Sequence, residues 1–211
     1  MTAKIMLITG LLCFFTLSAA DVAEIVKEIQ EKYEDLEYLS ADFIQVEKFK
    51  ITGSENETRG KIFVKNGIKY RLETEDQSIV TDGETVWTYS KFSNQVLIDR
   101  VKEGDGSLLP RDLLFRYPRD YIASLLAEVE LSGDDYFLLK LDPKEGVYGY
   151  VKTMKIWVNQ VDYIIAKIEY TDFNDNISTF EVQKVSTETK LPDRLFQFEI
   201  KEGMEVVDLR V

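Results

Sequence analysis

Carboxylates are the only abundant side chains in this sequence that could carry acid–base or metal chemistry. The 211-residue chain has 38 Asp and Glu residues, no His and a single Cys. The absence of His excludes Ser-His-Asp and Cys-His nucleophile systems and leaves any metal site to carboxylates. Two pairs, Asp134 with Asp135 and Glu73 with Glu75, have the composition of a glycosidase-type pair. So acidic a chain contains such pairs by chance, and a carboxylate-dependent hydrolase is therefore only one of the alternatives.

The other sequence motifs indicate turns and not sites. Residues 172–176 resemble the start of a calcium loop, because oxygen-bearing side chains stand at alternate positions. However, Ile177 replaces the required glycine and Gln183 replaces the final glutamate, so a hairpin turn is the better interpretation. The chain also lacks a Gly-x-Ser-x-Gly elbow, a phosphate-binding glycine loop and a dinucleotide fingerprint.

The region over residues 59–99 predicts an antiparallel meander. Short β-branched and aromatic runs follow one another there, separated by the turn signals Asn66-Gly67, Asp82-Gly83 and Ser93-Asn94. We therefore expect at least four consecutive strands. Their apolar residues are larger and more numerous than one half-buried sheet face requires.

An amphipathic helix is predicted over residues 21–37, before the meander. Apolar side chains recur there at spacings of three and four, namely Val22, Ile25, Val26, Ile29, Tyr33 and Leu36. A strand over residues 41–49 and a polar turn over residues 52–57 are expected to follow.

Two further helices are predicted after the meander. Ser107 is expected to cap a short helix, and Pro118 to open a second helical run over residues 121–129. Both are strongly apolar, and Gly104 and Gly106 supply hinges before them, so we expect the pair to cover the sheet.

The remaining sequence predicts strands again, within a single domain over residues 21–211. They are expected at residues 136–141, 150–158, 163–171, 177–185 and 194–200, with hairpin-type turns at 159–162 and 173–176.

The first twenty residues indicate a secretory signal peptide, cleaved after Ala20. Lys4 precedes an apolar stretch over residues 5–17, and Ser18-Ala19-Ala20 supplies the small residues of a cleavage site. Cys13 lies in the apolar stretch, so the exported protein would contain no cysteine and no disulfide. Its charge would be 25 − 38 = −13, which argues against nucleic acid as a partner.

Four segments have the residue types, order and spacing of segments in a known family: residues 40–45, 60–72, 79–89 and 196–208. Residues 132–136 are similar to a fifth segment of that family. Through these segments the chain resembles the LolA family of periplasmic outer-membrane lipoprotein carriers over essentially its whole mature length. The resemblance implies a mainly β (α+β) fold, an incomplete antiparallel β-barrel of about eleven strands with an N-terminal helix and inserted lid helices.

The same resemblance implies a function without enzymatic chemistry. The expected protein is a monomer without cofactor that holds the acyl chains of a lipoprotein in an apolar cavity. It would receive acylated lipoproteins from an inner-membrane lipoprotein-releasing transporter and pass them to the outer membrane, where an acceptor is a further expected partner.

The candidate site residues divide into a cavity wall and a lid. The expected cavity wall consists of large apolar strand residues, namely Phe43, Phe63, Tyr70, Leu72, Ile79, Trp87, Tyr89, Val96 and Ile98. The expected lid consists of apolar residues in the two inserted helices, namely Leu108, Leu109, Leu113, Leu114, Ile122 and Leu125. Taken singly, each aromatic side chain would also suit an ordinary core.

One departure from the family concerns the lid latch. Many members have Lys-Arg-Pro where this chain has Lys65-Asn66-Gly67, and the resemblance implies that the family's arginine latches the lid. Neither Asn66 nor Gly67 can replace a guanidinium, so this role cannot be transferred. A second function on the same scaffold, an envelope lipid- or lipoprotein-sensing interaction module, also remains open.

Overall fold

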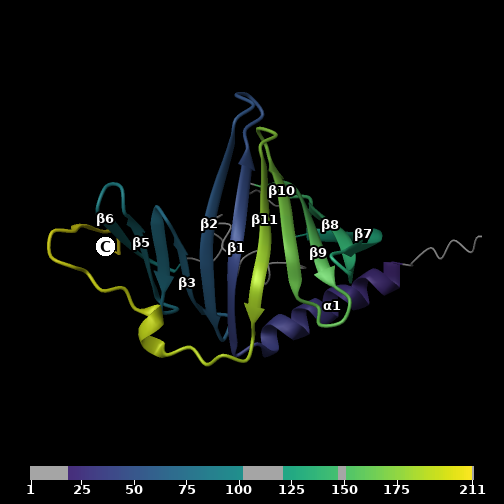
Figure 1. The fold of residues 1–211 in the computed structure, drawn as a ribbon, viewed down its shortest axis with the longest axis horizontal. Coiled ribbons are helices and arrows are strands. Elements are labelled where there is room, and N and C mark those ends of the chain that lie inside the picture. The colour runs from purple at the N-terminus through teal and green to yellow at the C-terminus, as the bar shows by residue number, and fades with distance from the viewer. Residues whose placement is uncertain (1–18, 102–120, 147–150, 211) are drawn as a thin grey trace, which may run out of the picture.

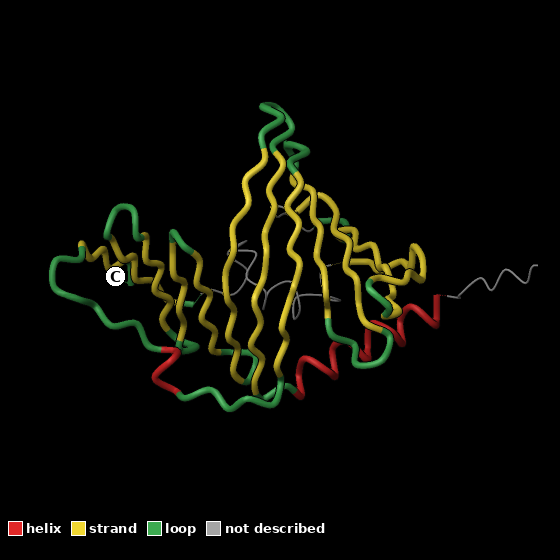
Figure 2. Tube along the Cα trace, viewed as in Figure 1, coloured by secondary structure: helices red, strands yellow, loops and turns green. Residues whose placement is uncertain are grey.

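A single sheet of twelve strands forms most of the part of the protein that the structure, a computed structural model, describes: residues 19–101, 121–146 and 151–210. Figures 1 and 2 show this sheet with one long helix lying across one side of it. In chain order the elements are α1 (Ala19–Asp35), β1 (Tyr38–Lys48), β2 (Glu55–Lys65), β3 (Lys69–Thr74), β4 (Gln77–Thr81), β5 (Thr85–Ser90), β6 (Gln95–Arg100), β7 (Tyr121–Leu131), β8 (Asp134–Pro143), β9 (Val151–Asn159), β10 (Ile165–Asp172), β11 (Ile177–Ser186), the 3₁₀ helix η1 (Asp193–Phe196) and β12 (Glu205–Asp208).

The sheet is open and curved. Its strand order is β12-β6-β5-β4-β3-β2-β1-β11-β10-β9-β8-β7, so β12 and β7 form its two ends. All neighbours pair antiparallel except β12, which runs parallel to β6. The structure thus confirms the expected mainly β, incomplete barrel with an N-terminal helix, and it has twelve strands where about eleven were predicted.

Strand β1 joins the two halves of the sheet. It pairs with β2 through all eleven of its residues, from Tyr38↔Lys65 to Lys48↔Glu55, and with β11 on its other side. The meander β2–β6 therefore lies on one side of β1, and the strands β11 to β7 lie on the other (Figure 1).

Helix α1 covers the inner face of one half of the sheet. Its apolar stripe of Ile25, Val26, Ile29 and Tyr33 is buried in one cluster with alternate residues of β8, β9 and β10, such as Leu139, Met154 and Ile168. We call the face packed against α1 the inner face. The predicted amphipathic helix is confirmed, with bounds two residues earlier than expected at each end.

The outer face of that same half is solvated and carries ion pairs. Lys155 contacts Glu169 at 2.9 Å and Lys167 contacts Glu181 at 3.3 Å, in each case across neighbouring strands. The Lys167 ammonium also lies 5.1 Å from the centre of the Trp157 ring. This half of the sheet therefore has one apolar and one polar face, as an antiparallel sheet with one covered side should.

The outer face of the meander is covered by the C-terminal part of the chain. Arg71 donates to the carbonyl oxygen of Leu195 at 3.1 Å, and the rings of Tyr89 and Phe198 lie 5.5 Å apart. Further along, β12 pairs with the edge strand β6. Figure 1 shows this C-terminal segment, in yellow, returning along the meander after β11. The C-terminal segment thus buries the outer face of the meander, which accounts for part of its surplus of apolar residues.

The helix predicted after Pro118 is wrong. Residues 121–131 form β7, an edge strand paired with β8. Alternate side chains are exposed along it, including Ile122 and Leu126. The apolar residues of this segment fit both the helical period of 3.6 and the strand period of 2. Pairing with β8 makes the segment a strand.

Two other boundaries also differ from the sequence prediction. The strand expected at residues 194–200 is wrong, because η1 begins after Pro192 and β12 starts only at Glu205. The polar turn expected at residues 52–57 is shorter, since β2 already begins at Glu55 and continues the β1 hairpin. The first predicted lid helix, with Leu108, Leu109, Leu113 and Leu114, lies outside the described residues, as does most of the predicted signal peptide.

Substituting Phe196 with Ala should destabilise the protein by about 3–5 kcal/mol, the usual range for a buried Phe. The Phe196 side chain is 0% exposed in the segment that covers the meander. Ile200→Ala in the same segment is the control, because Ile200 is 48% exposed and should change stability by less than about 0.5 kcal/mol. Urea unfolding measures both, and equal effects would contradict the predicted covering role.

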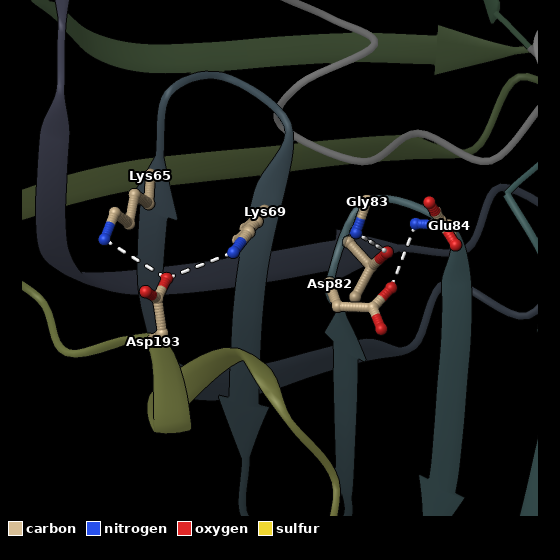
Figure 3. A network of polar contacts seen from close by, with 7 residues as sticks. Lys65, Lys69, Asp82, Gly83, Glu84 and Asp193 are labelled. Atoms are coloured by element: carbon tan, nitrogen blue, oxygen red, sulfur yellow. Dashed lines mark hydrogen bonds and ion pairs between the residues drawn. The ribbon is translucent and has the colours of Figure 1, made fainter.

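Asp193 should titrate below the ordinary range of an Asp carboxyl. Lys69 and Lys65 contact its Oδ1 at 3.0 and 3.2 Å (Figure 3), and hydrogen bonds from Lys69 and then Lys65 lower the pKa of Asp193. A lowered folded-state pKa adds stability above the unfolded pKa of about 3.9 and loses it as pH falls through the folded value. NMR titration should show the lowered pKa, and a Lys65→Met/Lys69→Met variant should bring it back toward 3.9.

Candidate functional site

A cavity of about 520 Å³ lies on the inner face, over the centre of the sheet. Its volume falls within the range of about 300–1,000 Å³ that is usual for small-molecule sites. Helix α1 ends beside it, and its walls come from β1 to β4, β10 and β11. The apolar lining residues are Tyr33, Leu36, Leu39, Ala41, Phe43, Ile62, Val64, Leu72, Ile79, Phe92, Ile164, Ile165, Ile168, Tyr170, Phe180, Val182 and Val185.

Strand register explains why this wall is apolar. Residues directly opposite each other in an antiparallel pair point to the same face. One such row runs from Ala41 to Ile62, Leu72 and Ile79 across β1, β2, β3 and β4. All four residues line the cavity, so a continuous apolar strip crosses four strands.

The glycine of β2 makes room for an aromatic ring in this wall. Gly60 lies opposite Phe43. A methyl group placed on Gly60 would lie 2.5 Å from the carbonyl oxygen of Glu73 and closer still to the Phe43 ring. The ring can therefore lie over Gly60 only because position 60 has no side chain.

The two ends of the cavity differ in polarity. Lining residues of β1 extend from Leu39 to Glu47, eight residues apart, which at about 3.3 Å per residue corresponds to roughly 26 Å. The end near α1 is apolar. The other end has polar lining residues, which are Gln45, Glu47, Thr58, Thr74, Asp76, Gln77 and Ser90.

Tyr33 closes the wall beside α1, and its hydroxyl oxygen has a backbone hydrogen-bond partner. Its hydroxyl oxygen accepts a hydrogen bond of 3.0 Å from the backbone N–H of Ile165. Burial raises the pKa of Tyr33 well above its usual range, so the group stays neutral and its ring acts as an apolar surface.

The register divides the nine predicted cavity residues between two faces. Three of them, Phe43, Leu72 and Ile79, line the cavity. Tyr70 is on the same face of β3 as Leu72 but is buried and is not a lining residue. The other five point to the outer face, where the C-terminal segment covers the meander, and they are Phe63, Trp87, Tyr89, Val96 and Ile98.

The predicted lid residues do not meet the cavity in the described structure. Ile122 and Leu125 belong to β7, and Leu125 packs in the cluster beneath α1. The predicted lid residues between 108 and 114 lie outside the described residues.

Residues of β10 and β11 were missing from the sequence-based list. Ile168 of β10 lies opposite Phe180 of β11, and Val182 of β11 lies opposite Phe43 of β1. Alternation of apolar residues in these strands was visible in the sequence. The pairing of β11 with β1, which lies some 140 positions earlier in the chain, was not visible in the sequence.

The described residues offer little for catalysis. No three His, Cys, Asp or Glu side chains gather there in a way that could hold a metal ion. Glu73 contacts Arg71 at 2.6 Å, away from the cavity. The Asp172 carboxylate accepts hydrogen bonds from the backbone N–H groups of Asn174 and Asn176 at 2.7 and 2.9 Å, which confirms the predicted hairpin turn.

The position of the family's latch holds a tight turn. Asn66 and Gly67 both have positive φ angles, of 51° and 61°, as the predicted Asn-Gly turn requires. Gly67 is itself a lining residue, and no guanidinium is available at either position.

Comparison with known proteins identifies a family that this chain matches. The family described as "Outer membrane lipoprotein carrier protein LolA" matches residues 34–199. The outer-membrane lipoprotein carrier protein of Haemophilus influenzae is 26% identical over 197 residues, which cover 92% of each chain.

Solved structures share the fold at lower identity. An uncharacterized conserved protein from Thermus thermophilus has a TM-score of 0.60 and 14% identity, covering 89% of this chain and 98% of its own. MucB, in the MucA/MucB complex of Pseudomonas aeruginosa, has a TM-score of 0.52 and 16% identity, covering 85% of this chain and 61% of its own. No helix in the described residues is long and apolar enough to cross a membrane.

Gly60→Ala should reduce both stability and cavity volume, because the new methyl group would displace the Phe43 ring toward the cavity and strain the contact with β3. We expect a loss of about 1–3 kcal/mol, typical of overpacking. Adding Phe43→Leu should recover part of this loss, since the ring would no longer be in the way. Urea unfolding of the two single variants and the double variant measures the coupling, and purely additive effects would contradict this role of Gly60.

Proposed function

The chain belongs to the LolA family, and on this premise we propose that it is a periplasmic carrier that binds acyl chains of lipoproteins in the inner-face cavity and delivers them from the inner to the outer membrane. Carriers of this family are periplasmic and non-enzymatic. The expected partners are acylated lipoproteins, the inner-membrane transporter that releases them, and an outer-membrane acceptor.

The observation that carries this proposal is the apolar strip across the inner face. A sheet face packed on a protein core has no need of an open volume, whereas about 520 Å³ remains here between α1 and the meander. Burying about 12 methylene groups of an acyl chain at ~0.8 kcal/mol each would contribute roughly 10 kcal/mol. This is sufficient for binding after the entropic costs of association.

The proposal also reassigns the predicted residues. Phe43, Leu72 and Ile79 would contact the acyl chain together with Ile62 and Phe180. The five outer-face residues would act in packing beneath the C-terminal segment. The apolar residues between 108 and 114 remain candidates for a lid.

A second candidate is a lipid- or lipoprotein-sensing module, which the fold similarity to MucB favours. The two functions differ in what happens to lipoproteins. A carrier should release newly made lipoproteins from spheroplasts into the medium when the purified protein is added. A sensor should bind a membrane regulator and leave the lipoproteins on the spheroplasts, and this outcome would reverse our ranking.

Ile79→Glu should weaken binding of an uncharged fluorescent acyl probe at least tenfold, because a carboxylate would have to be desolvated against the chain. The same variant should release less lipoprotein from spheroplasts. Ile122→Glu is the matched control, since Ile122 is 59% exposed on the edge strand β7 and should behave like the wild type. Equal loss in both variants, or no saturable binding by the wild type, would refute the proposed site.

A further inference from the structure

The charged groups of the cavity are confined to one end and carry the same sign. Glu47 and Asp76 are the two carboxylates among the described lining residues, and no Lys or Arg belongs to that lining. Neither carboxylate forms an ion pair within the described ranges of the chain. A ligand group placed at this end would therefore meet a negative field in a partly enclosed site.

In the described structure a cation, Lys91, lies beside this end and is already engaged. The Lys91 ammonium donates to the carbonyl oxygen of Thr74 at 2.7 Å. The backbone N–H of Lys91 donates to the carbonyl oxygen of Asp76 at 2.8 Å. Counting Lys91 with the two carboxylates leaves a net charge of 1 − 2 = −1.

Among the described lining residues, the opposite end is apolar. Leu36, Leu39 and Val64 lie there, and the Tyr33 hydroxyl oxygen already accepts a hydrogen bond from the Ile165 N–H. A polar head placed at this end would lose hydrogen bonds to water with little replacement, which is costly. An acyl tail placed there would lose nothing.

We propose that the cavity binds an acyl chain in one orientation, with the tail toward Tyr33 and the head at the Glu47–Asp76 end, and that it selects uncharged or cationic heads over anionic ones. The inference rests on the proposed function and specifies its ligand. Ester- and amide-linked acyl chains meet this requirement. Free fatty acids and lipids with phosphate monoester heads do not. Such selection would let a carrier take acylated protein while rejecting anionic lipids around it.

Orientation can be tested with two tryptophan reporters on one strand. Thr58 and Val64 both line the cavity from β2, six residues and hence about 20 Å apart. An uncharged monoacylglycerol brominated at the chain end should quench Val64→Trp more strongly than Thr58→Trp. Bromine beside the head should reverse the order. Trp87 and Trp157 are both on the outer face, so wild-type protein gives the background, and equal or inverted quenching would overturn the orientation.

Head selection can be tested with three probes that share a twelve-carbon chain: monododecanoyl glycerol, dodecyltrimethylammonium and dodecanoate, each below its micelle concentration. Dodecanoate should bind roughly tenfold more weakly than the glyceride, the scale expected for like charges where Glu47 is partly buried and Asp76 is exposed. In Glu47→Gln/Asp76→Asn this ratio should fall toward one. Glu128→Gln/Glu130→Gln on β7 is the matched control, because it removes the same two charges elsewhere and should keep the tenfold ratio.

The outcomes separate this inference from the proposed function. If none of the three probes binds, the cavity is not an acyl site and the proposed function itself fails. If the probes bind with equal affinity, or if the β7 control changes the ratio as much as the cavity variant does, only the head-group selection fails.

Discussion

The pairing of β1 with β2 on one side and with β11 on the other is the constraint on which the rest of this structure depends. It makes one sheet from two halves that are far apart in the sequence. It also determines which side chains share a face. Because side chains alternate along every strand, a shift of one residue in the β1–β2 pairing would place outward-facing residues of β2 opposite Ala41 and Phe43. The apolar strip of the cavity would then no longer exist.

Two elements of the chain each cover part of this sheet, one on each face. Helix α1 covers the inner face of β7 to β10, and the C-terminal segment covers the outer face of the meander. Neither reaches the inner face over β1 to β4, and this is where the cavity remains. The space is therefore bounded by packed elements, and its walls need not collapse when it is empty. It is also closed incompletely. A carrier needs incomplete closure, because a cavity that closed fully around several acyl chains would release them slowly.

The chemistry of the cavity suits binding better than reaction. Its inner surface is built from Leu, Ile, Val and aromatic side chains, and its few polar residues collect at one end. The chain belongs to the LolA family and shares its fold with MucB.

The sequence by itself determined the local structure and the family. Periodicity predicted α1 and most strands, the Asn66-Gly67 and Asp82-Gly83 turns predicted the meander, and the absence of His excluded the common nucleophiles. Only the tertiary structure decided which residues line the cavity. Trp87 and Ile79 look equally suitable in the sequence, yet they point to opposite faces. Residues 121–131 fit a helix or a strand, and pairing with β8 made them a strand. Propensity and turn chemistry act over a few residues, whereas the facing of a side chain is set by strand pairing, both between consecutive strands such as β7 and β8 and between distant ones such as β1 and β11.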